Sequence, residues 1–230
     1  NVDDLKFFRL QMSTGEEKHF YYIKNRRKNG QFANYVGNGI RFTQTAASTA
    51  GSYWYFVDAT NDLPEGTEIP QGCVACRIYN AGNALAVENP NGNMTENSDE
   101  TWPAKIYFIR KHDKTYWDYV IYPYNESDAG WNDLTGTHVT AHSYDDTGSI
   151  WSIEATGKSE SDLIAEAATA KTNALAYFDL AEAADYFTYS DEAIATAKAA
   201  VKDLDVATDL VTATTSHIAI ESAISTLKGT

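Results

Sequence analysis

The sequence predicts an all-β domain of three similar units over residues 1–156, followed by an all-α three-helix bundle over residues 157–230. Three observations lead to this fold class. A short apolar and aromatic phrase that ends in Asn recurs in the first part of the chain. Aromatic residues are concentrated there, since all five Trp and 12 of the 15 Tyr residues precede residue 157. The rest is rich in Ala at helical spacing, so the domain boundary is expected near residues 155–159.

The repeated phrase sets the size of each unit. Its copies end at Asn25, Asn80 and Asn125, and such spacings of roughly 45 to 55 residues are typical of internally repeated folds. A second, aromatic phrase recurs in step with the first. The first phrase covers Phe20–Asn25, Ala75–Asn80 and Val120–Asn125, and the second covers Tyr53–Val57, Lys105–Ile109 and Ser149–Ile153.

Alternation of apolar and polar residues predicts short strands in the first domain. Turn residues that tolerate positive φ separate them, as in Asn29-Gly30 and Asn38-Gly39. Three units of about four short strands fit a β-trefoil best, with a β-sandwich as the alternative architecture. The predicted strands are Lys6–Met12, Phe20–Asn25, Gln31–Val36, Ile40–Gln44, Tyr53–Asp58, Cys73–Asn80, Ala84–Glu88, Lys105–Arg110, Trp117–Tyr124, His138–His142 and Ser149–Glu154.

Capping signals and helical periodicity predict three helices in the second domain. The first helix begins at Ser159–Asp162, which resembles a capping box, and continues to about Tyr186. Ser190 caps the second helix, and Asp205 is expected to open the third. The short links between these amphipathic segments predict an antiparallel bundle.

The strand and turn pattern of the first domain resembles the ricin-type β-trefoil lectin superfamily, best over Phe20–Val36 with Tyr53–Val57 and over Ala75–Val87 with Ile106–Ile109. In that superfamily a Gln-x-Trp motif braces the fold and the sugar pocket. The corresponding positions here read Ser52-Tyr53-Trp54, Ala104-Lys105-Ile106 and Ser149-Ile150-Trp151, without the Gln. The resemblance therefore implies the fold and leaves the sugar sites open.

The helical part is similar to a FIVAR-type three-helix module. That resemblance, which rests on length, Ala content and helix order over residues 157–230, implies a structural spacer. Such modules occur in large secreted bacterial surface and glycan-degrading proteins.

Sugar binding needs an aromatic face for the apolar side of a pyranose ring, with Asp or Asn to bond its hydroxyl groups. The third unit contains most groups of this kind next to predicted turns, and one more aromatic residue lies in a polar loop of the second unit. The candidate carbohydrate-binding residues are Asp128, Trp131, Asn132, Tyr144 and Asp146, together with Trp102.

Composition and motifs argue against several other classes of function. A net charge of −14 disfavours binding to nucleic acid and to anionic membrane surfaces. The sequence has no run of about 20 apolar residues, so no membrane-spanning helix is predicted. The sequence contains no recognisable nucleophile with its base, no catalytic carboxylate pair and no phosphate-binding loop, so neither an enzyme nor a cofactor is predicted. His138 and His142 could lie on one face of a strand, but no third metal ligand occurs at a suitable spacing, so no metal site is predicted. Cys73 and Cys76 are expected to be free thiols.

The basic cluster Lys24–Lys28 is interpreted as a solvated hairpin tip, with the sulfate or carboxylate of an anionic glycan as the alternative ligand.

These observations predict a non-catalytic carbohydrate-binding accessory segment of a larger secreted or cell-surface bacterial protein. Its expected partners are a glycan and the neighbouring domains of that protein. Any catalysis is expected elsewhere in the larger protein. Two alternatives remain open: a protein-binding module, adhesin or protease inhibitor, that uses the loop Asp58–Gln71, and an architectural spacer with degenerate sugar sites.

Overall fold

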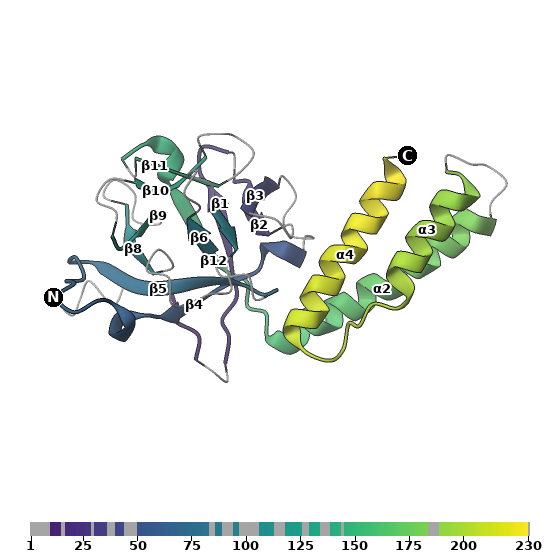
Figure 1. The fold of residues 1–230 in the computed structure, drawn as a ribbon, viewed down its shortest axis with the longest axis horizontal. Helices are drawn as coiled ribbons and strands as arrows, with labels where there is room; N and C mark the ends of the chain where they lie inside the picture. Colours follow the sequence, from purple (N-terminus) through teal and green to yellow (C-terminus); the bar gives the residue numbers. More distant parts are fainter. Residues whose placement is uncertain are drawn as a thin grey trace. The chain divides into compact units, whose positions relative to one another are not determined.

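A computed structural model describes residues 10–14, 17–28, 30–35, 40–43, 50–82, 86–88, 94–96, 106–112, 118–125, 129–133, 139–143, 145–183 and 189–229. The chain divides into two compact units, one of residues 1–48 and 52–157 and the other of residues 49–51 and 158–230. The described part of the first unit is rich in strands, and three α-helices follow in the described part of the second (Figure 1). The predicted order, β-rich and then helical, is confirmed.

Six antiparallel strands of the first unit form a closed ring. They pair in the order β1, β4, β5, β8, β9 and β12, and β12 pairs with β1 to close the ring. Closure removes the free sheet edges that would otherwise invite pairing with other chains. The ring strands are β1 Tyr21–Asn25, β4 Trp54–Asp58, β5 Cys73–Asn80, β8 Tyr107–Lys111, β9 Asp118–Pro123 and β12 Trp151–Ala155.

Three two-stranded hairpins occur between successive ring strands along the chain. They are β2 Phe32–Tyr35 with β3 Ile40–Thr43, β6 Ala86–Glu88 with β7 Met94–Glu96, and β10 Ala129–Asn132 with β11 Thr140–Ser143. A six-stranded ring with three hairpins is compatible with the predicted trefoil arrangement. Three short 3₁₀ turns complete the described elements: η2 Ala50–Ser52, η3 Thr60–Asp62 and η5 Thr147–Ser149.

Most predicted strands are present within two or three residues of their expected bounds, but β7 and β10 were not predicted. Residues 10–12 of the predicted Lys6–Met12 strand are not in a strand, and residues 6–9 lie outside the described part. The adjacent Ser13 forms an isolated parallel bridge with Val57.

The recurring Asn has a structural role in the first two copies of the phrase. Asn25 and Asn80 are fully buried at the ends of β1 and β5. Each side chain donates to a backbone carbonyl of an adjacent segment and accepts from a backbone N–H of the turn that follows it. Asn125 is exposed. The acceptors are Gly148 O at 2.8 Å for Asn25 and Tyr53 O at 3.1 Å for Asn80, and the donors are Lys28 N at 3.1 Å and Gly82 N at 3.0 Å.

Aromatic side chains fill the interior of the ring. The Trp131 indole packs edge-on against three other buried rings, with centroids 6.2 Å from Trp54, 5.9 Å from Tyr107 and 5.9 Å from Trp151. Edge-to-face pairs of this kind are favoured by the ring quadrupoles. Each of the three rings comes from a different copy of the second aromatic phrase, so the repeated sequence supplies the walls around Trp131.

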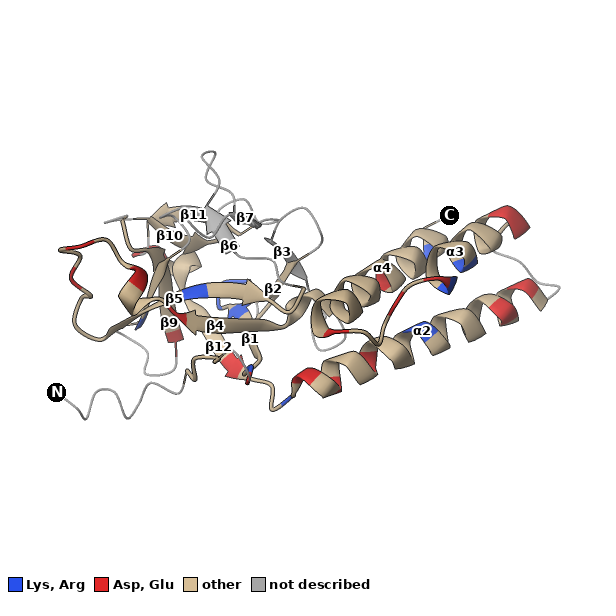
Figure 2. Cartoon of the chain, turned by 60° about the horizontal axis from the view of Figure 1, so that its bottom comes forward, with Lys and Arg blue, Asp and Glu red and all other residues tan. Residues whose placement is uncertain are grey.

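The second unit contains α2 Glu160–Ala183, α3 Asp191–Lys202 and α4 Leu210–Lys228, and each helix packs against the other two. Phe178, Ile194 and Val201 lie in their shared core. Acidic residues outnumber basic ones along these helices (Figure 2), with 12 Asp and Glu against five Lys and Arg over residues 157–230. No helix of the described residues is long and apolar enough to cross a membrane.

The prediction that Asp205 opens the third helix was wrong. Asp209 is the N-cap of α4 and accepts from the Thr212 N–H at 2.9 Å. Asp205 instead accepts from the Ala207 and Thr208 N–H groups, which forms a local turn before the helix. Ser190 caps α3 as predicted, since its hydroxyl accepts from the Ala193 N–H.

Candidate functional site

The predicted sugar-site residues differ in their position and burial in the structure. Asn132 and Asp146 lie next to one another, with the Asn132 amide 3.3 Å from Asp146 Oδ1. Trp131 is fully buried in the ring, so its indole presents no face to a ligand; this corrects the expectation that it stacks on a sugar. Trp102, Asp128 and Tyr144 lie outside the described residues.

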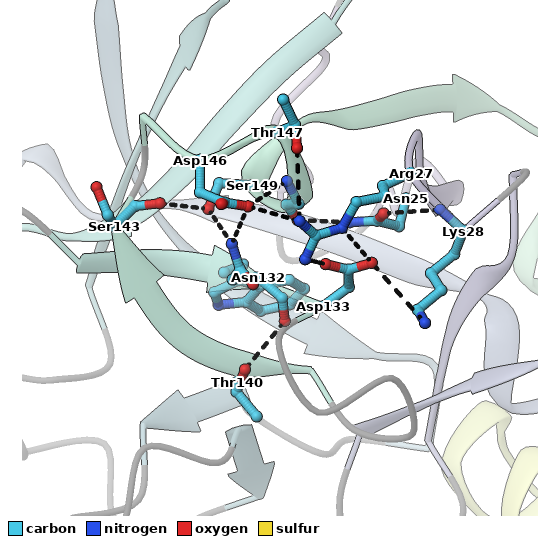
Figure 3. Close-up of polar contacts among 12 residues, drawn as sticks. Asn25, Arg27, Lys28, Asn132, Asp133, Thr140, Ser143, Asp146, Thr147 and Ser149 are labelled. Carbon is cyan, nitrogen blue, oxygen red and sulfur yellow. Dashed lines mark hydrogen bonds and ion pairs between the residues drawn. The ribbon is translucent and has the colours of Figure 1, made fainter.

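Asn132 and Asp146 belong to a polar cluster around the 3₁₀ turn η5 (Figure 3). The buried Asn132 amide also donates to Ser149 Oγ at 2.8 Å, and Asp146 accepts from the Gly148 N–H at 2.6 Å as the N-cap of the turn. The Gly148 N–H, followed by Asn132 and Arg27, lowers the pKa of Asp146. Asp146 is therefore held ionised inside an internal hydrogen-bond network.

Arg27 closes this cluster from the turn after β1. Its guanidinium donates to both carboxylate oxygens of Asp133, whose side chain is only 1% exposed, and to Asp146 Oδ1 at 3.0 Å (Figure 3). A Cβ atom on Gly148 would overlap both Asp133 and Arg27, which explains why glycine stands there. We name Arg27, Asn132, Asp133 and Asp146 the Arg27 clasp. Its guanidinium and carboxylates pair with one another and Asn132 Nδ2 donates to Asp146, whereas Asn132 Oδ1 is buried without a hydrogen-bond partner. The clasp fastens the β1–β2 turn to β10 and η5.

The rest of the basic cluster is also paired. Lys24 Nζ lies 2.5 Å from Glu154, Arg26 Nε lies 2.7 Å from Asp118, and Lys28 Nζ lies 4.0 Å from Asp133. The cluster lies at the β1–β2 turn with Arg26 and Arg27 exposed, in agreement with the hairpin-tip interpretation, and its ion pairs do not favour an open anion site. Its positive charges are neutralised by acids more than 90 residues away in the chain.

Beside the Arg26–Asp118 pair lies a cavity of about 450 Å³, formed by the neighbouring strands β1, β9 and β12 and the segment before β1. This volume is in the range of small-molecule pockets. The cavity is lined by Leu10, Tyr21, Arg26, Asp118, Tyr119, Ser152, Ile153, Glu154 and Ala155.

One wall of the cavity is polar. The Asp118 side chain is only 4% exposed, whereas that of its partner Arg26 is 54% exposed. Ser152 lies opposite Asp118 in the register of β9 and β12, and its hydroxyl donates to Glu154 Oε1 at 3.0 Å. Lys24 donates to the other oxygen of Glu154 at 2.5 Å. The wall therefore presents two carboxylates, one guanidinium and one hydroxyl. Glu154 is held by hydrogen bonds from Ser152 and Lys24, whereas Asp118 Oδ1 forms an ion pair with Arg26 but accepts no hydrogen bond.

The other walls are aromatic and aliphatic. The Tyr21 and Tyr119 side chains are almost fully buried, and Leu10 and Ile153 pack against the ring core. Burial raises the pKa of Tyr21, whose hydroxyl accepts from the Gln11 N–H at 2.7 Å, so this phenol stays protonated at neutral pH. The cavity thus combines apolar surface with both donors and acceptors.

Sequence reasoning missed this cavity. Asp118, Ser152 and Glu154 read as ordinary residues of alternating strands, and only Arg26 was singled out, as part of the basic cluster. Because strand closure brings β1, β9 and β12 together, local patterns hold no signal for the cavity. Among the described residues, no group of three or more His, Cys, Asp or Glu side chains could hold a metal ion.

No protein-family model and no curated protein matches the sequence. In structure the chain is similar to a mosquitocidal holotoxin, with 15% identity, a TM-score of 0.49 and coverage of 60% of this chain but only 17% of the toxin chain. It is also similar to the BEL β-trefoil, with 9% identity, a TM-score of 0.49 and coverage of 65% and 99% of the two chains. An exo-β-1,3-galactanase from Clostridium thermocellum matches with 12% identity and a TM-score of 0.46, over 64% of this chain and 31% of that one.

Proposed function

We propose that the first unit is a β-trefoil module that binds a carbohydrate in the cavity between β1, β9 and β12. The observation that carries this proposal is the Arg26–Asp118 pair beside the apolar side chains of a 450 Å³ cavity. Pyranoses present hydroxyl groups that both donate and accept, together with an apolar C–H face. The two parts of the cavity wall match these two properties.

The trefoil assignment is supported by strand order. Six strands close a ring, and each of the three hairpins follows one ring strand and precedes the next along the chain. Such an arrangement is what three similar units of four strands require. A β-sandwich, the alternative architecture, has two separate sheets instead of one closed ring.

Preorganisation also favours ligand binding at this cavity. The Arg26 and Asp118 side chains hold one another at 2.7 Å, and Ser152 and Lys24 both orient Glu154. A ligand that bonds these groups loses little further side-chain freedom from the protein, which lowers the free-energy cost of binding.

In the wider chain, we propose a non-catalytic accessory role within a secreted or cell-surface bacterial glycan-active protein. The helical unit would serve as a FIVAR-type spacer between such a module and its neighbours. Asp146, with Trp102, Asp128 and Tyr144, remains proposed for a second sugar-contacting surface in addition to the cavity. Trp131 and Asn132 have no such role because both side chains are fully buried, which corrects the expectation for both residues.

A glycan array with the full chain tests the function, and a steric variant tests the site. Ala155→Trp places a large side chain at the exposed end of β12 beside the cavity, while Ala207→Trp makes the same change at an exposed loop position of the second unit. We expect selective glycan binding by the wild type and Ala207→Trp, and loss of binding by folded Ala155→Trp. A folded wild type that binds no glycan overturns the function, and undiminished binding by Ala155→Trp overturns the site.

A protein-binding role has one observation in its favour. The loop between β4 and β5 is largely exposed at Pro64–Gly66, while Leu63 and Ile69 anchor it on a buried cluster with Ala75 and Phe108. Exposed loops anchored in this way suit protease inhibitors. Saturable inhibition of a protease without any glycan signal would favour this second candidate.

A further inference from the structure

We propose that the cavity selects neutral glycans and discriminates against sugars that carry a carboxylate or sulfate group. This inference rests on the proposed function and goes beyond it, since it names the ligand class of the same cavity. It follows from the charges on the polar wall, which contains two carboxylates, Asp118 and Glu154, and one guanidinium, Arg26.

The guanidinium is already engaged. Arg26 Nε lies 2.7 Å from Asp118 Oδ1, and the Asp118 side chain is 4% exposed. An anionic ligand that attracted Arg26 would compete with Asp118 and leave a buried carboxylate without its cation. Removing the cation from a carboxylate buried to this degree is unfavourable, and the half-exposed position of Arg26 reduces that cost. Arg26 therefore supplies hydrogen-bond donors to a neutral hydroxyl more readily than it supplies net positive charge to an anion.

The nearby ammonium group is engaged as well. Lys24 Nζ lies 2.5 Å from Glu154 Oε2 and 4.7 Å from the centroid of the Phe32 ring. Lys24 is not one of the residues that line the cavity. The two cations, Lys24 and Arg26, are matched by Glu154 and Asp118, so the wall has no excess positive charge for an acidic sugar.

Sugar hydroxyls meet no such obstacle. Carboxylate oxygens have several lone-pair positions, so Asp118 and Glu154 can accept from hydroxyls while they keep their ion pairs. Neighbouring Ser152 Oγ, which donates to Glu154 at 3.0 Å, can accept in turn. The overall charge of −14 adds a long-range repulsion of anions.

Matched monosaccharides test the inference directly. Galactose and galacturonic acid, and glucose and glucuronic acid, differ only at C6, and their binding to the full chain is measured by ligand-observed NMR titration at low salt. For each neutral sugar that binds, we expect a Kd about tenfold lower than that of its uronic acid. This ratio corresponds to a difference in binding free energy of about 1.4 kcal/mol. The difference should shrink as salt is added.

A charge variant assigns the discrimination to the cavity. Glu154→Gln removes one cavity carboxylate and releases Lys24, so the affinity of the uronic acid relative to its neutral partner should rise several-fold. Glu65→Gln removes one charge from an exposed position in the β4–β5 loop, away from the residues that line the cavity, and should leave this ratio as in the wild type. Because Glu154 is half-exposed, the variant is expected to fold, which thermal denaturation followed by circular dichroism verifies.

The outcomes separate the two proposals. Binding of no sugar at any salt concentration overturns the proposed function itself. If uronic acids bind as tightly as the matching neutral sugars or more tightly, and Ala155→Trp abolishes this binding, the proposed function stands and the proposed selectivity is overturned. Discrimination that is identical in Glu154→Gln and Glu65→Gln overturns the assignment of selectivity to the cavity charges.

Discussion

The indole N–H of Trp151 donates a hydrogen bond of 2.8 Å to the backbone carbonyl oxygen of Trp131. Trp54 makes the corresponding bond, also of 2.8 Å, to the carbonyl of Ala33. In both cases the acceptor is on the first strand of a hairpin, β10 or β2, and the donor is on the ring strand that follows. Each indole therefore fastens a hairpin to the ring in addition to filling the core.

Removing this donor should destabilise the first unit. Trp151→Phe leaves the buried Trp131 carbonyl without its indole partner and leaves a small cavity in the core. An unsatisfied buried polar group and a core cavity together cost about 2 to 4 kcal/mol. We expect this loss in urea denaturation of the full chain followed by near-ultraviolet circular dichroism, and a similar loss for Trp54→Phe. A change below about 0.5 kcal/mol would contradict the role of the bond.

The Arg27 clasp predicts a second large effect. Arg27→Ala leaves the Asp133 carboxylate, 1% exposed, without its guanidinium partner. Breaking a buried pair from one side costs about 3 to 5 kcal/mol, and the 40% exposure of Arg27 reduces our expectation to about 2 to 3 kcal/mol. Arg77→Ala is the matched control, because its partner Asp62 is 49% exposed and remains hydrated. Equal losses in the two variants would refute the importance of the buried carboxylate.

The two acidic residues before α4 should differ in their contribution to stability. Asp209→Ala removes the N-cap and should destabilise the helical unit by about 1 kcal/mol. Asp205→Ala removes only an exposed turn contact and should cost less. Thermal denaturation followed at 222 nm measures both. A larger loss for Asp205→Ala would restore the boundary predicted from sequence.

Burial raises the pKa of Glu221 from 4.5 to about 7. The folded state then holds the Glu221 proton more tightly than the unfolded state does, so stability falls as pH rises from about 4.5 to about 7. Glu221→Gln has no such titration and should be more stable than the wild type by about 1 to 2 kcal/mol at pH 8, with a smaller difference at pH 5. His217, 3.7 Å from Glu221, is present in both proteins, so the difference between their pH–stability curves reports Glu221 together with its interaction with His217. A difference that does not change with pH would contradict the shift.

Local patterns predicted much of the fold. The alternation in Tyr21–Asn25 and Cys73–Asn80 gave β1 and β5, and the Ser190 capping signal gave the start of α3. They failed at β10, because the sequence Asp128-Ala129-Gly130 is typical of a turn, whereas Ala129 and Gly130 begin a strand. That error placed Trp131 beside a loop and made it a sugar-stacking candidate, whereas pairing with β11 directs it into the core.

The sequence by itself determined the order of a β-rich part and three helices, because period-two and helical spacing depend on residues only a few positions apart. Only the tertiary structure decided that Lys24 and Arg26 pair with Glu154 and Asp118, and that a cavity lies beside them. The physical reason is ring closure: β12 pairs with β1 across more than 100 residues of chain. Electrostatic pairing and desolvation at such a contact depend on which strands become neighbours, and neither leaves a periodic trace in the sequence.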